Sequence, residues 1–417
     1  MIAEWLHPWS IEFWGAGRKL IQDIGKIRVL VVNDSLIIRE YLCDIIRSSE
    51  KLELSGTARD GADALRKLQQ VRPDVILLDL EMPNMDGITL IEHVMSQSKR
   101  IPIIVVSSYG DIHSIDDGND YQNDTSSIIF DCLNAGAVDF VSLAPGMHKE
   151  ESRIGNSEDV RHELISRIET ASQANITKLR PIATSKNWKK RTLSNSDSNS
   201  NIYCSSYNEK PIVIIGSSAG GPRVVAQILS KLPGDLWAGV LIVQHMPPTF
   251  TPGFARHLDS ISPLNVKEAS EGDVLSPGLA FVAPGDYHVL VDRAGVLHLD
   301  KSARRHGVRP CINMSMVSAS NAFGKKVLGV VLSGMGDDGA FGLKVIKRKG
   351  GRTIAQDRET SVVFGMAKAA SDLGAVEMMI PADKIAESIV KVLDDMKMSL
   401  DYAKQPLEME ATREHVQ

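Results

Sequence analysis

"DVILLDLEMPNMDGITLI", residues 74–91, joins a continuous apolar run to an acidic turn and then to a second apolar segment. Unbroken apolar runs of this length are typical of strands buried on both faces of a parallel sheet. The stretch therefore predicts a buried strand that ends in acidic residues. Functional groups in open α/β sheets gather at the carboxyl ends of strands, so Asp79 is a candidate site residue.

The same pattern extends outward on both sides of this stretch. Apolar runs with helical patterns between them predict further strands at 27–34, 52–58, 101–108 and 137–143. Strands that alternate with helices indicate an open, doubly wound α/β domain, here over 27–147.

A second block, 211–396, repeats this architecture with a different sequence. Buried strands are expected at 211–218, 239–245, 326–334 and 375–381. Helices are expected after Pro222, after Gly339, and over 361–371 and 383–396. The block is predicted to be an α/β domain with a mostly parallel sheet.

Polar segments surround the two blocks. Residues 148–210 are predicted to hold a helix at 158–172 and then a flexible linker rich in serine and asparagine. Residues 397–417 are expected to form a frayed polar tail. Residues 1–26 form an extension with three of the five tryptophans, for which packing on the body and a peripheral amphipathic role both stay open.

The composition is that of an ordinary soluble protein. Of 417 residues, 43% are hydrophobic and 24% charged, and the net charge of −5 gives no reason to expect nucleic acid as a partner. No apolar run is long enough to span a bilayer, so an integral membrane protein is not expected. The cysteines form no CxxC pair, which argues against a structural zinc site and fits a cytoplasmic protein: Cys43, Cys132, Cys204 and Cys311.

Polar residues follow three predicted strands of the first block. Asn33 and Asp34 follow the first strand, Asp79 follows the third, and Ser107 ends the fourth. Carboxylates gathered at one sheet edge repel one another unless a cation such as Mg²⁺ neutralises them. In the alternative interpretation, Asp34 caps a helix and Asp79 is a loop acid.

The second block opens with "IIGSSAGGP", residues 214–222, which could cradle a phosphate or present a nucleophile. Ser218 stands where a dinucleotide fingerprint needs its middle glycine, and no lysine follows as a phosphate loop requires. The segment does match G-x-S-x-G, with Ser218 at the nucleophile position. Small residues that merely allow close strand–helix packing are the alternative.

A serine nucleophile needs a base and a group that orients the base. His245 ends the next predicted strand, and Asp337 and Asp338 lie in a glycine-rich turn after a later strand. The order serine, histidine, aspartate differs from that of α/β-hydrolases, which points to another fold. A structural histidine and a simple helix cap are the alternatives.

Residues 27–147 resemble the flavodoxin-like receiver domains of two-component response regulators. The motifs that carry the resemblance are residues 74–91, "VVNDS" (31–35), "VVSS" (105–108) and "GAVDFV" (136–141). The resemblance implies phosphorylation of Asp79, phosphate sensing by Ser107, and a Mg²⁺ site made by Asp34, Asp79 and the backbone carbonyl of Glu81.

The first block departs from the receiver pattern at three places. Asn33 replaces the first acid of the usual pair, and Leu143 stands where receivers carry a lysine that contacts the phosphate. The connection 110–128 is longer and more acidic than usual.

Residues 211–396 resemble the catalytic domain of CheB-like protein-glutamate methylesterases, and the order of receiver, linker and esterase is that family's architecture. The matching motifs are "IGSSAGGP", "QHMPPTFTPGFARHL" (244–258), "VLSPGLAFVAPGDYHV" (274–289), "VVLSGMGDDGAFG" (330–342) and "AQDRETSVVFGMAKAA" (355–370). The resemblance implies Ser218 as nucleophile, His245 as general base and Asp338 as its orienting group. The backbone N–H groups of Met335 and Ala219 are the expected oxyanion donors, and no cofactor is expected for the esterase.

By the same resemblance, the substrate is a methylated glutamate on the cytoplasmic domain of a chemoreceptor, and certain glutamines are deamidated. A chemotaxis histidine kinase is the expected phosphate donor, and the protein is expected to be a monomer. The receiver is expected to cover the active site until phosphorylation loosens it. Two alternatives stay open: an esterase whose receiver is only an interaction module, and a non-catalytic protein that binds receptors.

Overall fold

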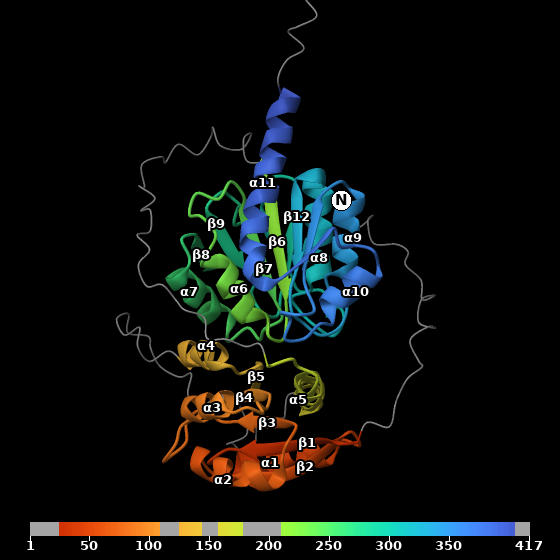
Figure 1. The fold of residues 1–417 in the computed structure, drawn as a ribbon. Coiled ribbons are helices and arrows are strands. Elements are labelled where there is room, and N and C mark those ends of the chain that lie inside the picture. Colours follow the sequence, from red (N-terminus) through yellow and green to blue (C-terminus); the bar gives the residue numbers. More distant parts are fainter. Residues whose placement is uncertain (1–24, 109–124, 144–156, 178–209, 405–417) are drawn as a thin grey trace, which may run out of the picture.

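The computed structural model describes residues 25–108, 125–143, 157–177 and 210–404, which form two α/β units stacked end to end (Figure 1). The proposed roles of the extension, of most of the 110–128 connection and of the linker fall outside the described residues. In the described part, no helix is both long and apolar enough to cross a membrane.

The first unit contains a five-stranded sheet in the order β2-β1-β3-β4-β5, and every pair is parallel. This order is that of the flavodoxin-like doubly wound fold, which confirms the prediction from the sequence. The strands are β1 (Ile27–Val32), β2 (Leu52–Ala58), β3 (Val75–Leu78), β4 (Ile103–Ser108) and β5 (Asp139–Leu143).

Helices cover both faces of this sheet because alternate strand residues point to opposite sides. Val29 and Val31 pack toward α1 and α5, whereas Leu30 and Val32 pack toward α2, α3 and α4. The helices are α1 (Leu36–Arg47), α2 (Gly61–Val71), α3 (Gly87–Ser96), α4 (Thr125–Ala135) and α5 (Ser157–Ser172).

Helix α5 is the helix that the sequence places at the start of the linker. Its residues Leu164 and Ile168 are fully buried in the core of the first sheet. Arg167 pairs with Asp139 at 2.7 Å, at the start of β5. The helix therefore belongs structurally to the first unit, because its apolar side chains cover the face of the sheet beside β4 and β5.

The second unit contains a seven-stranded parallel sheet in the order β14-β13-β12-β6-β7-β9-β8. The four predicted strands are present, and β13, β8 and β9 are additional strands that the sequence did not indicate. The strands are β6 (Ile212–Ser217), β7 (Gly239–Gln244), β8 (Asn265–Glu268), β9 (Leu279–Val282), β12 (Val327–Val331), β13 (Arg352–Gln356) and β14 (Met378–Ile380). An antiparallel hairpin, β10 (His288–Val291) and β11 (Leu297–Asp300), stands beside it.

Helices α6, α7 and α11 pack on one face of this sheet, and α8, α9 and α10 pack on the other. Their bounds are α6 (Gly221–Leu229), α7 (Thr251–Ile261), α8 (Ile312–Phe323), α9 (Ala340–Arg348), α10 (Met366–Asp372) and α11 (Ala382–Lys404), and a short 3-10 turn, η4, covers Gly324–Lys326.

The predicted end of the last helix at 396 is wrong. Helix α11 continues to Lys404 and projects beyond the body of the second unit, away from the first unit (Figure 1). The sequence offers no glycine or proline after residue 396 until Pro406, so nothing interrupts the helix at the predicted boundary.

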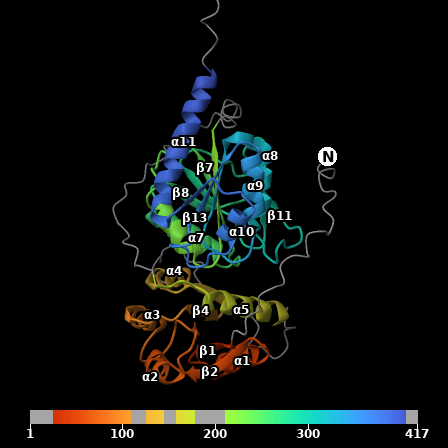
Figure 2. The ribbon, with the colours of Figure 1, turned by 45° about the vertical axis from the view of Figure 1, so that its right-hand side comes forward.

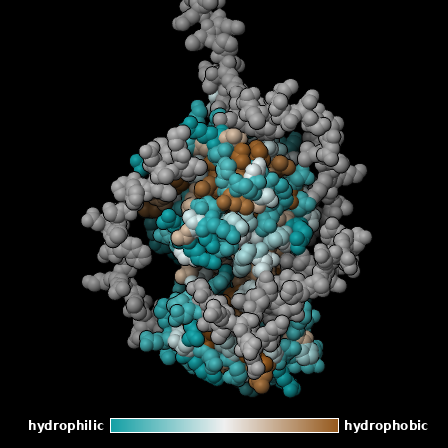
Figure 3. Space-filling model, turned by 180° about the vertical axis from the view of Figure 1, so that it is seen from behind, coloured by the Kyte–Doolittle hydropathy of each residue, from teal (hydrophilic) through white to brown (hydrophobic). Residues whose placement is uncertain are grey.

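Helices α4 and α5 of the first unit lie against the second unit (Figure 2). Aromatic side chains and shared apolar clusters form the contact. Phe130 on α4 stacks on Phe254 and His257 of α7, with ring centroids 5.2 and 5.1 Å apart. Phe140 on β5 meets Phe250 edge-on at 4.7 Å. Seen from behind, the surface of the first unit is mainly hydrophilic, whereas apolar residues are more frequent on the second unit (Figure 3).

Candidate active site

Three neighbouring strands bring the predicted catalytic residues to one edge of the second sheet. Ser218 follows β6, His245 follows β7, and Asp338 lies in the turn after β12. Strand β6 lies between the other two, with Gly216 in register with Val331 and with Val243. The chain leaves β6 toward β7 on one side and returns at β12 on the other, and ligands bind at such switch points.

The turn after β6 separates the roles of its two serines. Ser217 is fully buried, and its hydroxyl donates to Oε1 of Gln244 at 2.5 Å. Nε2 of Gln244 in turn donates to the carbonyl oxygen of Ser218 at 3.1 Å. Ser218 is partly exposed, so it is the serine whose hydroxyl can reach a substrate. The turn closes with Gly220 at φ 72, a left-handed conformation that favours glycine.

His245 and Asp338 form a direct pair, with Nε2 of the imidazole 2.9 Å from Oδ2 of the carboxylate. This orientation leaves Nδ1 as the nitrogen available to the serine. Among the described residues, no hydrogen bond joins the hydroxyl of Ser218 to His245. All three predicted residues thus lie at the same end of the sheet. A hydrogen bond joins two of them directly, His245 and Asp338.

The Asp338 carboxylate is buried and is held by several donors. Oδ2 also accepts from the N–H of Ile312 at 2.7 Å, and Oδ1 accepts from the N–H of Asn313 at 2.9 Å and from the thiol of Cys311 at 3.1 Å. Burial raises the pKa of Asp338, but the hydrogen bond and charge of His245 and the backbone donors outweigh it and lower the pKa to about 2. The group is a fixed anion beside the imidazole.

The predicted oxyanion donors lie on two turns that flank Ser218. Among the described residues, the backbone N–H groups of Ala219 and Met335 donate to no protein acceptor. The backbone between them is close-packed, because a Cβ on Gly334 would lie 2.8 Å from Cβ of Ser218 and 2.2 Å from Sδ of Met366. Both amides are therefore available near the serine.

The sequence missed two side chains that hold these turns together. The hydroxyl of Ser333 donates to the carbonyl of Ala219 at 2.8 Å and accepts from the N–H of Val363 at 3.0 Å. Oδ1 of Asn313 accepts from the N–H groups of Gly339 and Gly342 at 3.0 and 2.7 Å. Their long sequence separation from the motifs they support explains why no local pattern revealed them.

The predicted phosphorylation site gathers at the carboxyl end of the first sheet. Asp79 is buried, and its Oδ2 accepts from Nδ2 of Asn33 at 2.7 Å. Asp34 and Glu81 are exposed on the neighbouring loops, and Ser107 is buried near the end of β4. The structure thus gathers at this edge the residues that the sequence proposed for phosphate and Mg²⁺.

Leu143 and Arg39 set the charge around the predicted phosphorylation site. Leu143 is buried in the core shared with α5 and brings no charge to the pocket. Arg39 on α1 donates through Nη1 to the carbonyl oxygens of Asn33 and Asp34, at 2.7 and 3.2 Å. Its guanidinium is a positive charge beside the pocket that the sequence reasoning did not single out.

The chain is similar over most of its length to a curated protein from Pyrococcus horikoshii named "Protein-glutamate methylesterase/protein-glutamine glutaminase". The two are 41% identical over 375 residues, which cover 88% of this chain and 94% of that protein. This chain belongs to the CheB methylesterase family. The model for the CheB methylesterase matches residues 213–389, and that for the response regulator receiver domain matches 29–142.

Other members of the CheB family show the same relation. A protein of the same name from Caldanaerobacter subterraneus is 36% identical over 385 residues, covering 90% of this chain and 99% of that protein. The crystal structure of the Thermotoga maritima CheB methylesterase catalytic domain is 42% identical, covers 44% of this chain and 98% of that chain, and gives a TM-score of 0.43. The family confirms the class expected from the sequence, a methylesterase joined to a receiver.

Proposed function

We propose that this chain hydrolyses glutamate methyl esters on chemoreceptors, and deamidates certain receptor glutamines, through Ser218, His245 and Asp338. The observation that carries the assignment is the His245–Asp338 pair, 2.9 Å apart, at the strand ends beside Ser218. A buried anion that orients an imidazole next to a reachable serine is the arrangement that acyl transfer requires.

The reaction follows from the roles of these three groups. His245 accepts the proton of Ser218 as its hydroxyl attacks the ester carbonyl, and the same proton leaves with methanol. Water then attacks the acyl-enzyme with His245 again as base, which restores the serine and releases the glutamate. Asp338 stabilises the imidazolium that forms in both halves of the reaction.

The N–H groups of Ala219 and Met335 are the proposed donors to the oxyanion. Neither N–H has an acceptor within the part of the chain that the structure describes, which supports this role, because a donor that is already engaged cannot respond to charge that develops in the transition state. Loss of one such donor costs about 3 kcal/mol in other hydrolases. No cofactor takes part in the esterase step as proposed.

The receiver is the proposed regulatory switch, with Asp79 as phosphate acceptor and Ser107 as the residue that senses the phosphate. Asp34, Asp79 and the carbonyl of Glu81 offer only oxygen ligands, a set that fits Mg²⁺. When bound, Mg²⁺ neutralises charge between the carboxylate and the incoming phosphate. Asn33 presents its N–H to Asp79 and so supports the carboxylate without adding charge.

In the described arrangement the receiver covers the nucleophile turn, and Ala219 shares an apolar core with Leu164 and Ile168 of α5. Phosphorylation is proposed to weaken this contact and to expose Ser218 to the receptor. The partners are then the cytoplasmic domain of a methylated receptor and a chemotaxis histidine kinase, with the enzyme acting as a cytoplasmic monomer.

Methanol release from methylated receptor membranes tests this proposal. Ser218→Ala is expected to abolish release while the thermal unfolding midpoint stays within a few degrees of the parent; undiminished release would remove the assignment. An acyl-phosphate donor is expected to label the parent and not Asp79→Asn. The presence of Leu143 favours a second candidate function, an esterase whose receiver is only an interaction module. In that case the acyl-phosphate donor would not stimulate methanol release.

A further inference from the structure

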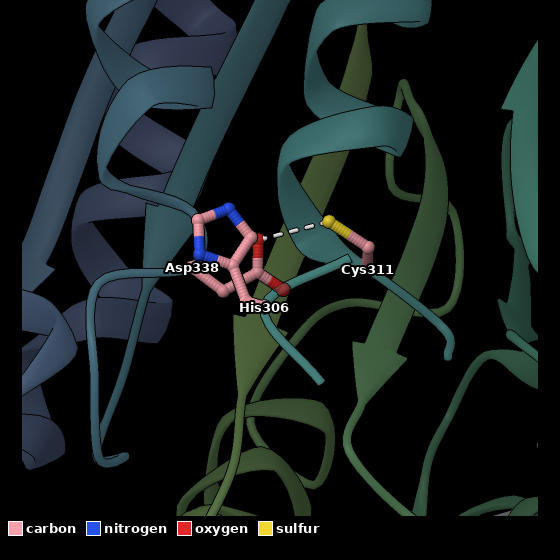
Figure 4. A group of neighbouring side chains, drawn as sticks. All are labelled: His306, Cys311 and Asp338. Carbon is pink, nitrogen blue, oxygen red and sulfur yellow. Dashed lines mark hydrogen bonds between the residues drawn. The ribbon is translucent and has the colours of Figure 1, made fainter. Parts of the chain in front are cut away.

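A second cluster of side chains meets at the oxygen of Asp338 that His245 does not use. Oδ2 faces His245, whereas Oδ1 lies 3.1 Å from Sγ of Cys311. His306 completes the cluster, and one ligand atom from each of His306, Cys311 and Asp338 lies within 4.8 Å of the others. The three side chains converge from the loop after β11, the start of α8 and the turn before α9 (Figure 4).

We propose that His306, Cys311 and Asp338 form a binding site for a borderline-soft divalent cation of the Zn²⁺ class, and that the bound ion inhibits the esterase. A thiolate, an imidazole and a carboxylate with one water complete the four-coordinate shell that Zn²⁺ prefers. Ligand atoms on a tetrahedral zinc ion are about 3.5 Å apart, given bonds of about 2.0 to 2.3 Å. Small side-chain rotations reach this spacing. Mg²⁺ and Ca²⁺ prefer oxygen ligands alone and are not expected to bind here.

The surroundings of His306 prepare it to act as a ligand. Its Nδ1 lies 3.0 Å from Oδ1 of Asp337, so this carboxylate can hold the proton on Nδ1 and leave the lone pair on Nε2. Nε2 lies 3.3 Å from Nδ2 of Asn313, a weak partner that a metal ion can replace. The His306 side chain is 42% exposed, whereas Cys311 and Asp338 are buried, so the ion can enter from solvent past the imidazole.

Inhibition is expected because one oxygen of Asp338 faces His245 and the other faces the proposed metal site. The ion binds Oδ1 and takes the place of the thiol proton of Cys311, which is released to solvent. Oδ2 still faces His245, but the carboxylate charge is now neutralised by the metal. The imidazolium that forms during acyl transfer loses its counter-charge, so the rate falls. This inhibitory consequence rests on the proposed function, whereas metal binding itself does not.

Cobalt binding to the full chain tests the site independently of activity. Co²⁺ added to the parent is expected to give a thiolate-to-metal charge-transfer band in the near ultraviolet, with one equivalent bound at this site. Cys311→Ser keeps a hydroxyl donor toward Asp338 but removes the thiolate, and it is expected to lose the band. His306→Gln is expected to weaken Co²⁺ binding at least about tenfold, as loss of one ligand should. A band of unchanged strength in Cys311→Ser, or no band in the parent, would overturn the site.

Methanol release with and without Zn²⁺ tests the inhibition. The buffer contains Mg²⁺ and a phosphate donor throughout, and each variant is compared with its own rate without Zn²⁺. Saturating Zn²⁺ is expected to slow the parent at least about tenfold, because Asp338 loses its charge. Cys311→Ser and His306→Gln are expected to resist. His298→Gln is the matched control, because His298 is also an exposed histidine paired with carboxylates, Glu271 and Asp292. It is expected to be inhibited like the parent.

Two results would count against the inhibitory role. Equal inhibition of the parent, Cys311→Ser and His306→Gln places the inhibiting ion elsewhere. The second result is a cobalt band that depends on Cys311 while methanol release is unchanged. The metal site would then stand, but its effect on Asp338 would be disproved, which weighs against the proposed triad.

Discussion

The carbonyl oxygen of Val138, the residue just before the last receiver strand, accepts a hydrogen bond of 3.1 Å from the backbone N–H of Gly220. Gly220 lies two residues after Ser218, so the receiver backbone bonds directly to the turn that presents the proposed nucleophile. Thr170 of α5 also contacts Sδ of Met335, whose backbone N–H is a proposed oxyanion donor. The receiver unit therefore contacts both turns that flank Ser218.

Phe130→Ala is expected to raise basal methanol release several-fold. Its ring stacks on Phe254 and His257, so truncation removes apolar contact between the units and shifts the population toward the open form. The stimulation by a phosphate donor should shrink in the same variant. Met398→Ala, on the exposed end of α11, is the control and should behave like the parent. A basal rate that stays at the parent level would contradict an inhibitory role for this contact.

Gly334→Ala is expected to reduce methanol release about a hundredfold, as displacement of an oxyanion donor does. The new Cβ meets Cβ of Ser218 at 2.8 Å and Sδ of Met366 at 2.2 Å, so the turn or the serine must move. Gly25→Ala, where a Cβ meets nothing, is a glycine control. Activity near that of the parent would show that the turn can relax without disturbing Ser218.

Asp338→Asn is expected to lower the rate by about 10⁴, because a neutral amide cannot stabilise the imidazolium. The amide would also turn an N–H toward donors of Ile312 or Asn313, so the unfolding midpoint should fall as well. Asp337→Asn is the neighbouring control, since the Asp337 side chain is 66% exposed and bonds only His306 among the described residues. Single-turnover kinetics separate the two effects, and equal rates for both variants would contradict the role of Asp338.

Stability is expected to decrease as the pH falls from 7.5 to 5.5, in part through His257. Burial lowers the pKa of His257, and the nearby Asp131 only partly offsets it. In the unfolded chain, this histidine has a pKa of about 6.5. The unfolded state therefore binds a proton at pH values where the folded state does not, so acid favours unfolding. Chemical denaturation at each pH measures the slope. His257→Gln should flatten it, and an unchanged slope would contradict the assignment.

Arg223→Met is expected to raise the unfolding midpoint. Arg223 lies in the first turn of α6, and burial alone lowers its pKa to about 10. Among the described residues, Arg223 has no hydrogen bond or ion pair through its guanidinium. A charged group that loses solvent without such a partner destabilises the folded state, and an apolar side chain of similar length removes that cost. Thermal unfolding measures the change. Arg293→Met is the surface control, and a lower midpoint for Arg223→Met than for this control would contradict the expectation.

The parallel sheets were predictable because their strands are continuous apolar runs that need no tertiary information. "DVILLDL" (74–80) and "GVLIVQH" (239–245) both became central strands. The strands β8 and β13 were missed because polar residues interrupt their sequences, NVKE and RTIAQ, so neither gives a continuous apolar run. The last helix was predicted to end too early, at residue 396, because a solvent-exposed helix lacks the periodic apolar residues that mark a packed helix.

The residue types alone were enough to propose the chemistry of the catalytic unit. The residue types at three strand ends are local facts, and a parallel sheet brings such ends to one edge. The choice of Ser218 over Ser217 also came from a local pattern, and the burial of Ser217 against Gln244 agrees with it.

The surroundings of those residues, in contrast, depend on how the chain packs in three dimensions. This packing joined α5 to the receiver and placed the carbonyl of Val138 on the nucleophile turn. It also brought Cys311 and His306 close to Asp338, whose other oxygen faces His245. These contacts link segments that lie tens of residues apart in the chain. They depend on how whole sheets and helices pack together, and no short stretch of sequence carries that information.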